Sequence, residues 1–122
     1  HALKYSQERI AFGKSLAKQQ AVAFKLAEMA TRIESSRHLV MHGLRLKDQG
    51  GANFVKEAAM AKIVASECAS YCADEAIQIL GGYGYVSEYH VERIYRDAKF
   101  CEIGRGTSEI CRLVVSRQSL NR

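Results

Sequence analysis

The strongest constraint on this chain is a run of apolar residues spaced three, four or seven positions apart in its first half. The run comprises Val22, Leu26, Met29, Ile33, Val40 and Leu44. This spacing places the side chains on one face of an α-helix, and Gly50 and Gly51 end the pattern. The pattern predicts a helix of about thirty residues. Because proline is absent from all 122 residues, no proline ring interrupts the predicted helices.

A second long helix is expected from residue 53 to residue 80. Asn53 is a candidate N-cap, and Glu57 places a carboxylate in the first turn, where the helix dipole favours it. Small side chains surround this segment, so neighbouring helices can approach it from more than one side. They are Ala58, Ala59, Ala61, Ala65, Ala69, Ala73 and Ala76. We therefore expect this helix to be central.

Shorter helices are expected near both ends of the chain. Residues 2–12 form one, and Gly13 ends it as a left-handed cap. That helix begins at His1 without an N-cap, which suggests a chain cut from a longer protein or an added remnant. An amphipathic segment at residues 88–99 and a last helix starting at residues 107–109 follow. Short loops between these helices predict an all-α fold, an antiparallel up-and-down four-helix bundle with an additional short helix.

Composition narrows the classes of partner. A chain of 122 residues fits one compact domain, and its formal net charge is +5. The basic residues are dispersed among acidic ones, so no nucleic-acid partner is expected. A phosphate-bearing small molecule is an anionic partner that is equally compatible with the positive net charge. No apolar run approaches the 18 or so residues that a membrane span requires. We therefore expect no membrane span.

The four cysteines do not suggest a disulfide framework or a metal site. Cys68 and Cys72 are one helical turn apart, a spacing that suits packing better than bridging. Zinc-site spacings such as CxxC are missing, and the pair His38 and His42 lacks a third ligand. We expect reduced, buried or inert thiols, which indicate an intracellular compartment.

Two glycine-rich loops lie at helix ends. Gly81-Gly82-Tyr83-Gly84 ends one helix, whereas Gly104-Arg105-Gly106-Thr107 leads into the last one. Only the second loop is suited to bind an anion, because free amides and hydroxyls at the start of a helix can bind a phosphate or a carbonyl oxygen. The alternative is that both sets of glycines only permit positive φ at helix termini. The loops by themselves indicate no reaction.

Seven motifs follow one another along the chain. They are ERIAFGK (8–14), QAV (20–22), KLAEMA (25–30), EAAMAK (57–62), AIQILGGYGY (76–85), RDAKF (96–100) and GTSEI (106–110). In this order and spacing they resemble the C-terminal domain of the acyl-CoA dehydrogenases, flavoenzymes that desaturate acyl thioesters between the α and β carbons. The resemblance implies that residues 1–122 are one helical domain of a longer protein, without the family's N-terminal helical domain and β-domain.

The resemblance also implies three groups of FAD-binding residues. One group reaches the FAD of a neighbouring subunit, a second lays its backbone against the adenosine diphosphate, and a third touches the flavin end. In that order they are Arg9, Phe12 and Gln20; Gln78, Ile79, Leu80, Gly81 and Gly82; and Thr107, Ser108 and Glu109. Plainer roles are a solvated charge for Arg9, a helix stop for Gly81 and an N-cap for Thr107.

The position of the catalytic base departs from the family pattern. Much of the family has a glutamate base in a Tyr-Glu-Gly-Thr string, and Gly104-Arg105-Gly106-Thr107 stands there. A guanidinium stays protonated, so Arg105 cannot accept the α-proton, and no residue of this chain is predicted to be catalytic. The sequence looks closest to branches such as the isovaleryl-CoA and long-chain enzymes, whose carboxylate lies on an earlier helix. That helix would precede His1.

Several alternatives remain at this site. The protein can be a catalytically silent homologue in which Arg105 blocks the pocket, or Glu102 can be a substitute base, although a solvated or salt-bridged role suits it better. Gly104 and Gly106 are candidates for making room for the acyl chain. His90 stands where the family often has proline, which adds a backbone donor. No catalytic role is inferred for it.

The resemblance implies partners and a location as well. They are an acyl-CoA substrate, an electron-transfer flavoprotein or other electron acceptor, and further copies of the chain in a dimer or tetramer. The location implied is the mitochondrial matrix or the bacterial cytoplasm. The competing hypothesis is a helical assembly module with no chemistry.

Overall fold

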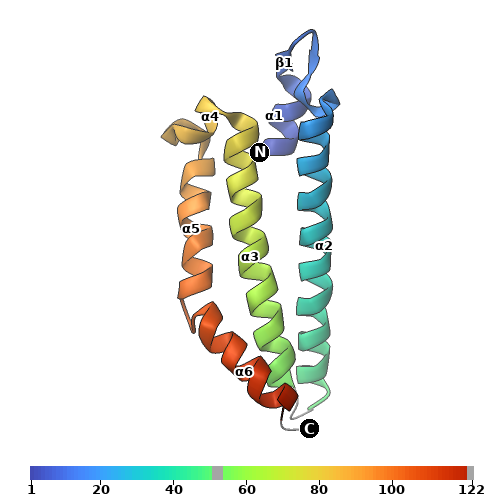
Figure 1. Cartoon of the computed structure of the whole chain (residues 1–122), viewed down its shortest axis with the longest axis vertical. Helices are drawn as coiled ribbons and strands as arrows, with labels where there is room; N and C mark the ends of the chain where they lie inside the picture. Colours follow the sequence, from blue (N-terminus) through green and yellow to red (C-terminus); the bar gives the residue numbers. More distant parts are fainter. Residues whose placement is uncertain (51–53, 121–122) are drawn as a thin grey trace.

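The computed structural model describes residues 1–50 and 54–120, and it is built almost entirely of helices (Figure 1). In chain order the elements are α1 (Ala2–Glu8), β1 (Ile10–Ala11), β2 (Lys14–Ser15), the 3-10 helix η1 (Leu16–Lys18), α2 (Gln20–Asp48), α3 (Phe54–Leu80), α4 (Gly82–Tyr85), the 3-10 helix η2 (Ser87–Tyr89), α5 (Val91–Ile103) and α6 (Ser108–Leu120). The prediction of an all-α fold with four main helices is confirmed.

Helix α3 is the centre of the domain. It packs against α1, α2, α4, α5 and α6. Figure 1 shows α2 and α5 antiparallel to α3, as expected for an up-and-down arrangement. Helix α6 continues in the direction of α5 beyond a bend, so that α5 and α6 follow one another along α3. The two short helices together thus cover about the length that α3 offers.

The two long helices have nearly the predicted bounds. Gly50 follows α2 with φ of +70°, the left-handed conformation that glycine adopts at helix ends. Glu57 lies in the first turn of α3, as predicted, while the proposed N-cap Asn53 and the stop residue Gly51 fall outside the described residues. Four of the seven alanines expected around α3 are buried, namely Ala59, Ala61, Ala73 and Ala76. Their small side chains let several helices approach α3 closely.

The first helix ends earlier than predicted. Instead of continuing to residue 12, α1 stops at Glu8, and β1 and β2 pair as an antiparallel hairpin with Ile10 opposite Ser15. Phe12 and Gly13 form its two-residue turn, with φ of +51° and +75°. Left-handed φ at both positions is the geometry that suits a tight hairpin. Gly13 is therefore a turn residue and not a helix cap, a distinction that the glycine signal alone cannot make.

The main apolar cluster lies near the end of the bundle where α1 meets α3. It is formed by Ala2, Ala76, Ile79, Leu80 and Val91. Many larger apolar side chains, such as Phe24, Phe100 and Leu113, lie exposed on outer helix faces. In the part of the chain that the structure covers, no helix has an apolar stretch long enough to cross a membrane.

Candidate functional site

The first predicted group lies at the end of the bundle that carries the hairpin. Phe12 stands at the hairpin turn with 98% of its surface exposed, and Arg9 and Gln20 are also exposed. The Gln19 side-chain amide donates a hydrogen bond to the Ala11 carbonyl at 3.3 Å, and the Leu16 amide donates to the Arg9 carbonyl at 2.9 Å. These bonds hold the hairpin onto the start of α2. An aromatic side chain and a cation are thus presented to the outside on a fixed support.

The second predicted group caps α3 at the same end of the molecule. Ile79 and Leu80 are buried in the core, so these two residues can offer only backbone atoms to a ligand. Gly81 ends the helix with φ of +61°, and its amide donates to the Ile77 carbonyl at 2.8 Å. A Cβ at Gly81 or Gly82 would meet no heavy atom within 4 Å, so the glycine backbone lies open beside the exposed Gln78.

A close approach between α4 and α3 fixes this glycine segment. A Cβ at Gly84 would lie 2.7 Å from the Ile77 carbonyl oxygen and 2.8 Å from the Ile77 Cα, so only glycine fits there. The Tyr83 ring contacts Tyr5 of α1 at a centroid distance of 6.1 Å and Tyr89 of η2 at 5.0 Å. These positioning contacts were not predicted. The string Gly81-Gly82-Tyr83-Gly84 signalled a loop, but the pairing of its tyrosine with α1 depends on the tertiary fold.

The third predicted group begins the last helix. The Thr107 hydroxyl accepts a hydrogen bond from the Ile110 amide at 3.3 Å, which makes Thr107 an N-cap. The pKa of Glu109 is lowered, first by a hydrogen bond from its own backbone amide and then by the Thr107 hydroxyl. Ser108 is buried and its hydroxyl donates to the Glu102 carbonyl at 3.5 Å. Capping is therefore present, and the exposed Glu109 carboxylate is held by these bonds and by Arg112, whose guanidinium lies 3.7 Å away.

The turn before this helix is strained. Arg105 has φ of +53° and Gly106 φ of +97°. A non-glycine residue in this conformation costs about 1–2 kcal/mol. A Cβ at Gly104 would lie 2.7 Å from the Phe100 ring and 3.2 Å from its carbonyl oxygen. Gly104 and Gly106 are thus required by the tight turn between α5 and α6, and the Arg105 side chain is exposed at this turn.

Glu102 links the α5–α6 turn to α3 through hydrogen bonds. Its carboxylate accepts hydrogen bonds from Lys99 at 2.7 Å and from the Ser70 hydroxyl of α3, while its carbonyl accepts one from Lys62 at 3.3 Å. The pKa of Glu102 is lowered, first by the bond from Lys99 and then by the bond from Ser70. A carboxylate stabilised in its ionised form is a weak proton acceptor. The structure favours a salt-bridged, positioning role over a substitute base.

One chain does not bring all three groups together. The first two share one end of the bundle, where α1 packs against α3 (Figure 1). The third group lies beyond the 13 residues of α5, which extend about 20 Å. A ligand that touches all of them must be long or be held between two copies of the chain.

His90 shows how the turn into α5 is built. Its φ is +60°, and its amide donates to the Ser87 carbonyl at 3.4 Å. Proline can adopt neither feature, because its ring fixes φ near −65° and it lacks the N–H. The backbone donor expected at this position is present.

Other polar clusters offer little for a metal. His38 is exposed and pairs with Glu34 at 3.4 Å, without His42. Within residues 1–50 and 54–120, no three His, Cys, Asp or Glu side chains gather as a metal site requires.

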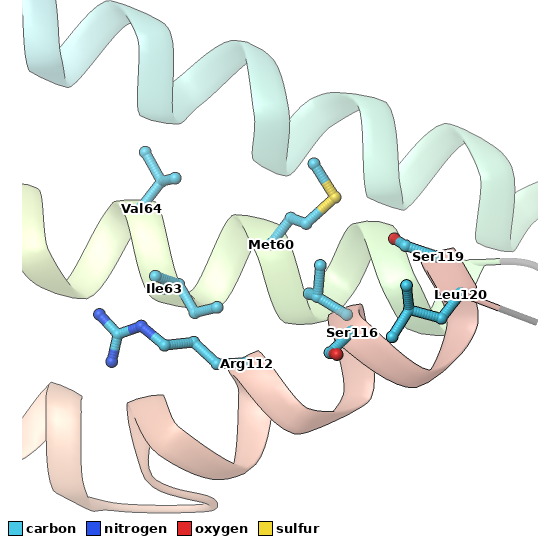
Figure 2. A pocket seen from close by; sticks show the side chains of 8 residues that line it. Met60, Ile63, Val64, Arg112, Ser116, Ser119 and Leu120 are labelled. Carbon is cyan, nitrogen blue, oxygen red and sulfur yellow. The ribbon is translucent and has the colours of Figure 1, made fainter.

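A pocket of about 450 Å³ lies between α3 and α6, lined by Met60, Ile63 and Arg112 among others (Figure 2). It contains none of the predicted site residues.

Comparison with known proteins identifies the family. Residues 1–120 match the family model described as "Acyl-CoA dehydrogenase, C-terminal domain". The chain belongs to this family. The acyl-CoA dehydrogenase of Bacillus subtilis is 50% identical over 120 residues, which cover 98% of this chain and 31% of that protein. The human mitochondrial short-chain specific acyl-CoA dehydrogenase is 53% identical over 115 residues, 94% of this chain and 28% of that protein.

Solved structures show the same fold for this acyl-CoA dehydrogenase domain. Butyryl-CoA dehydrogenase of Megasphaera elsdenii matches with a TM-score of 0.94 at 45% identity, over 98% of this chain and 31% of that one. A structure described as the electron-transferring flavoprotein of Acidaminococcus fermentans has a TM-score of 0.96 at 46% identity, over 99% and 32%. The FAD complex of PigA has a TM-score of 0.93 at 28% identity, over 97% and 30%. The domain thus spans about 31% of the length of the relatives it matches first.

Proposed function

We propose that this chain is the C-terminal helical domain of an FAD-dependent acyl-CoA dehydrogenase, which oxidises the α,β carbon–carbon bond of acyl-CoA thioesters. The observation that carries the proposal is the family match over residues 1–120 at half identity to named acyl-CoA dehydrogenases. In the whole protein, the domain supplies part of the FAD site and much of the contact between subunits. It has no activity by itself.

The hairpin end suits a cofactor held by a neighbouring subunit. Arg9 is a permanent cation for the pyrophosphate, and Phe12 and Gln20 contact the cofactor beside it. The exposure of all three side chains supports this role, because a residue that reaches into another subunit must project from its own. The hydrogen bond between Gln19 and Ala11 keeps the hairpin in place.

The glycine backbone after α3 suits the adenosine diphosphate part of FAD. The open space beside Gly81 and Gly82 is what a close approach of backbone to ligand requires, and Gln78, Ile79 and Leu80 extend that surface. The similarity to PigA, whose structure is an FAD complex, supports the choice of cofactor. FAD, when bound, accepts the hydride that leaves the β-carbon of the substrate.

The α5–α6 turn suits the flavin end and the acyl chain. Thr107, Ser108 and Glu109 lie against the flavin, with the Thr107 hydroxyl as hydrogen-bond donor, and Gly104 and Gly106 leave room for the acyl chain. The glycine segment after α3 and the α5–α6 turn, which we propose meet the same cofactor, are separated by α5, and this separation suits a dinucleotide that is itself long.

The proton acceptor lies outside this chain. Arg105 cannot take the α-proton, so we place the base on an earlier helix of the whole protein. The relatives reported above are named for short-chain and butyryl-CoA substrates, not for the isovaleryl-CoA and long-chain branches that the sequence around Arg105 resembles. Relatives named for short-chain and butyryl-CoA substrates support a short acyl chain.

The proposed acyl-CoA dehydrogenase function also implies an electron acceptor, an oligomeric state and a cellular location. An electron-transfer flavoprotein is the proposed electron acceptor, supported by the similarity to the structure described under that name. The exposed apolar faces of α2, α5 and α6 support a homodimer or homotetramer. The matched relatives come from mitochondria and from bacteria, which supports the mitochondrial matrix or the bacterial cytoplasm as the location.

The test is to express the full-length protein and measure its bound flavin and its reduction of an artificial electron acceptor with short acyl-CoA substrates. We expect a yellow protein that is active with acyl-CoA. A protein without bound flavin and without activity refutes the proposal. Phe12→Ala should lower flavin content without unfolding the domain, whereas Lys18→Ala, another exposed residue near this end, serves as the control.

A second candidate function is a catalytically silent assembly subunit. Arg105 in place of the base favours it, together with the extensive exposed apolar surface. A full-length oligomer that binds flavin but reduces no acceptor with any acyl-CoA is the outcome expected for this alternative.

A further inference from the structure

Two cysteines that the proposed function leaves unused lie side by side in α3. The Sγ atoms of Cys68 and Cys72 are 3.9 Å apart, and neither forms a disulfide. The pair is one helical turn apart, so both thiols emerge from the same face of the helix. That face looks toward α2, where the Cys72 thiol lies 4.0 Å from the Met29 carbonyl oxygen.

Two apolar grooves of this domain open beside the pair. One groove, of about 690 Å³, lies between α2, α3 and α5 and is lined by Cys72 together with Leu26, Ile33 and Val91. A smaller one, of about 360 Å³, is lined by both Cys68 and Cys72 and continues along α2 and α3. Cys68 itself is only 7% exposed, so a reagent that bridges the pair must seat its apolar part in these grooves.

The surroundings disfavour the usual ligands of cysteine. Burial, followed by the neighbouring Cys68 thiol, raises the pKa of Cys72 from its ordinary 9.0 to about 11. The Cys72 thiol is therefore mostly protonated near neutral pH, which slows its oxidation by peroxides and weakens its binding of zinc. Zinc would also require a third and a fourth ligand, and no such cluster occurs among the residues that the structure describes.

We propose that Cys68 and Cys72 form a binding site for neutral organic compounds of trivalent arsenic, whose apolar group occupies the groove beside Cys72. Such a compound, R–As(OH)2, condenses with two thiols: two As–S bonds form, two As–OH bonds break, and two water molecules leave with the two thiol protons. Arsenic stays in the +3 state, so no oxidant or reductant is required. This inference is independent of the flavoenzyme function.

The geometry also predicts what capture does to the fold. Both sulfur atoms belong to the same helix, so the bridge adds no covalent constraint between α2, α3 and α5. The helical content should stay unchanged, and only the groove beside the pair should be filled. A bridge between Cys72 and Cys101 of α5, which lines the same large groove, would instead fix two helices together.

The experiment is titration of the full-length protein with phenylarsine oxide, followed by mass spectrometry of tryptic peptides. Residues 63–93 form one such peptide, which carries both cysteines and neither Cys101 nor Cys111. We expect one phenylarsenic group per chain on this peptide, displaced by a dithiol but not by a monothiol. Recovery of the arsenic on a cross-linked pair of peptides, or no adduct at stoichiometric reagent, overturns the proposal.

Matched variants separate the pair from the other thiols. Cys68→Ala and Cys72→Ala should each weaken capture by about 100-fold or more, because the second As–S bond is lost. Cys101→Ser should leave capture unchanged. Retention of tight binding in either alanine variant, or its loss in Cys101→Ser, refutes the assignment. Peptide mapping of the unmodified sequence decides the question if an alanine variant does not fold.

Discussion

The contact between Gly84 and Ile77 permits a sharp test of how the glycine segment is held. In Gly84→Ala the new Cβ would lie 2.7 Å from a carbonyl oxygen and 2.8 Å from a Cα, both backbone atoms in the last turns of α3. Backbone atoms cannot rotate away as side chains can, so we expect this clash to destabilise the fold by about 3 kcal/mol, the upper end of the usual cost of overpacking. The helix propensity of alanine offsets about 1 kcal/mol. The net local destabilisation is therefore about 2 kcal/mol.

Hydrogen exchange is the suitable assay because it reports local opening. The Gly81 amide donates to the Ile77 carbonyl and the Gly84 amide to the Gly81 carbonyl, both at 2.8 Å. In the full-length protein, a loss of 2 kcal/mol should speed exchange in residues 77–86 by about 30-fold, since 1.4 kcal/mol is a factor of ten. If Gly81 and Gly82 contact FAD, flavin affinity should fall in parallel.

Gly82→Ala is the matched control. A Cβ at Gly82 meets no heavy atom within 4 Å, and its φ is not in the left-handed region. Exchange in residues 77–86 should therefore be unchanged or slower, because alanine favours the helical turn. Equal exchange in the two variants would refute the claim that a backbone contact with α3 fixes α4.

Three further predictions concern the α5–α6 corner and the α3 thiol. Arg105→Gly should raise stability by about 0.5–1 kcal/mol in thermal unfolding, because glycine relieves the left-handed strain; Arg105→Lys, which keeps the strain, should show no gain. Thr107→Ala should lower stability by about 1 kcal/mol in the same assay through loss of the N-cap, and Thr107→Ser should restore most of it. Cys72, with its pKa raised to about 11, should be alkylated more slowly at pH 8 than the exposed Cys101, and its rate should still rise above pH 9. Equal alkylation rates for Cys72 and Cys101 at pH 8 would contradict the raised pKa of Cys72. Because Cys72 loses its proton at a lower pH in the unfolded chain than in the folded one, the free energy of unfolding should fall between pH 9 and 11.

The distribution of the candidate cofactor residues bears on why this domain would act within an oligomer. The hairpin with Phe12 projects from the bundle, and the turn at Gly104 lies a helix length away from Gly81. A site that needs both segments is completed only by a long ligand or by a second copy. This arrangement agrees with a cofactor shared between subunits, and flavin content measured against protein concentration would test it.

Much of the fold could be read from the sequence because its signals are local. The three- and four-residue spacing of apolar side chains predicted α2, the alanine-rich segment predicted α3, and the glycines at 50, 81, 104 and 106 marked the ends of helices. The hydroxyl of Thr107 at a helix start likewise predicted its capping role. Each of these effects depends on residues within about one helical turn of one another.

Tertiary structure decided what local patterns leave open. A glycine stop fits both a helix cap and a hairpin turn, and pairing between β1 and β2 selects the turn at Phe12 and Gly13. The path of α6 beyond α5 and the hydrogen bond from Ser70 to Glu102 arise from packing on α3. These contacts join residues far apart in sequence, so their energies appear only when the helices are assembled.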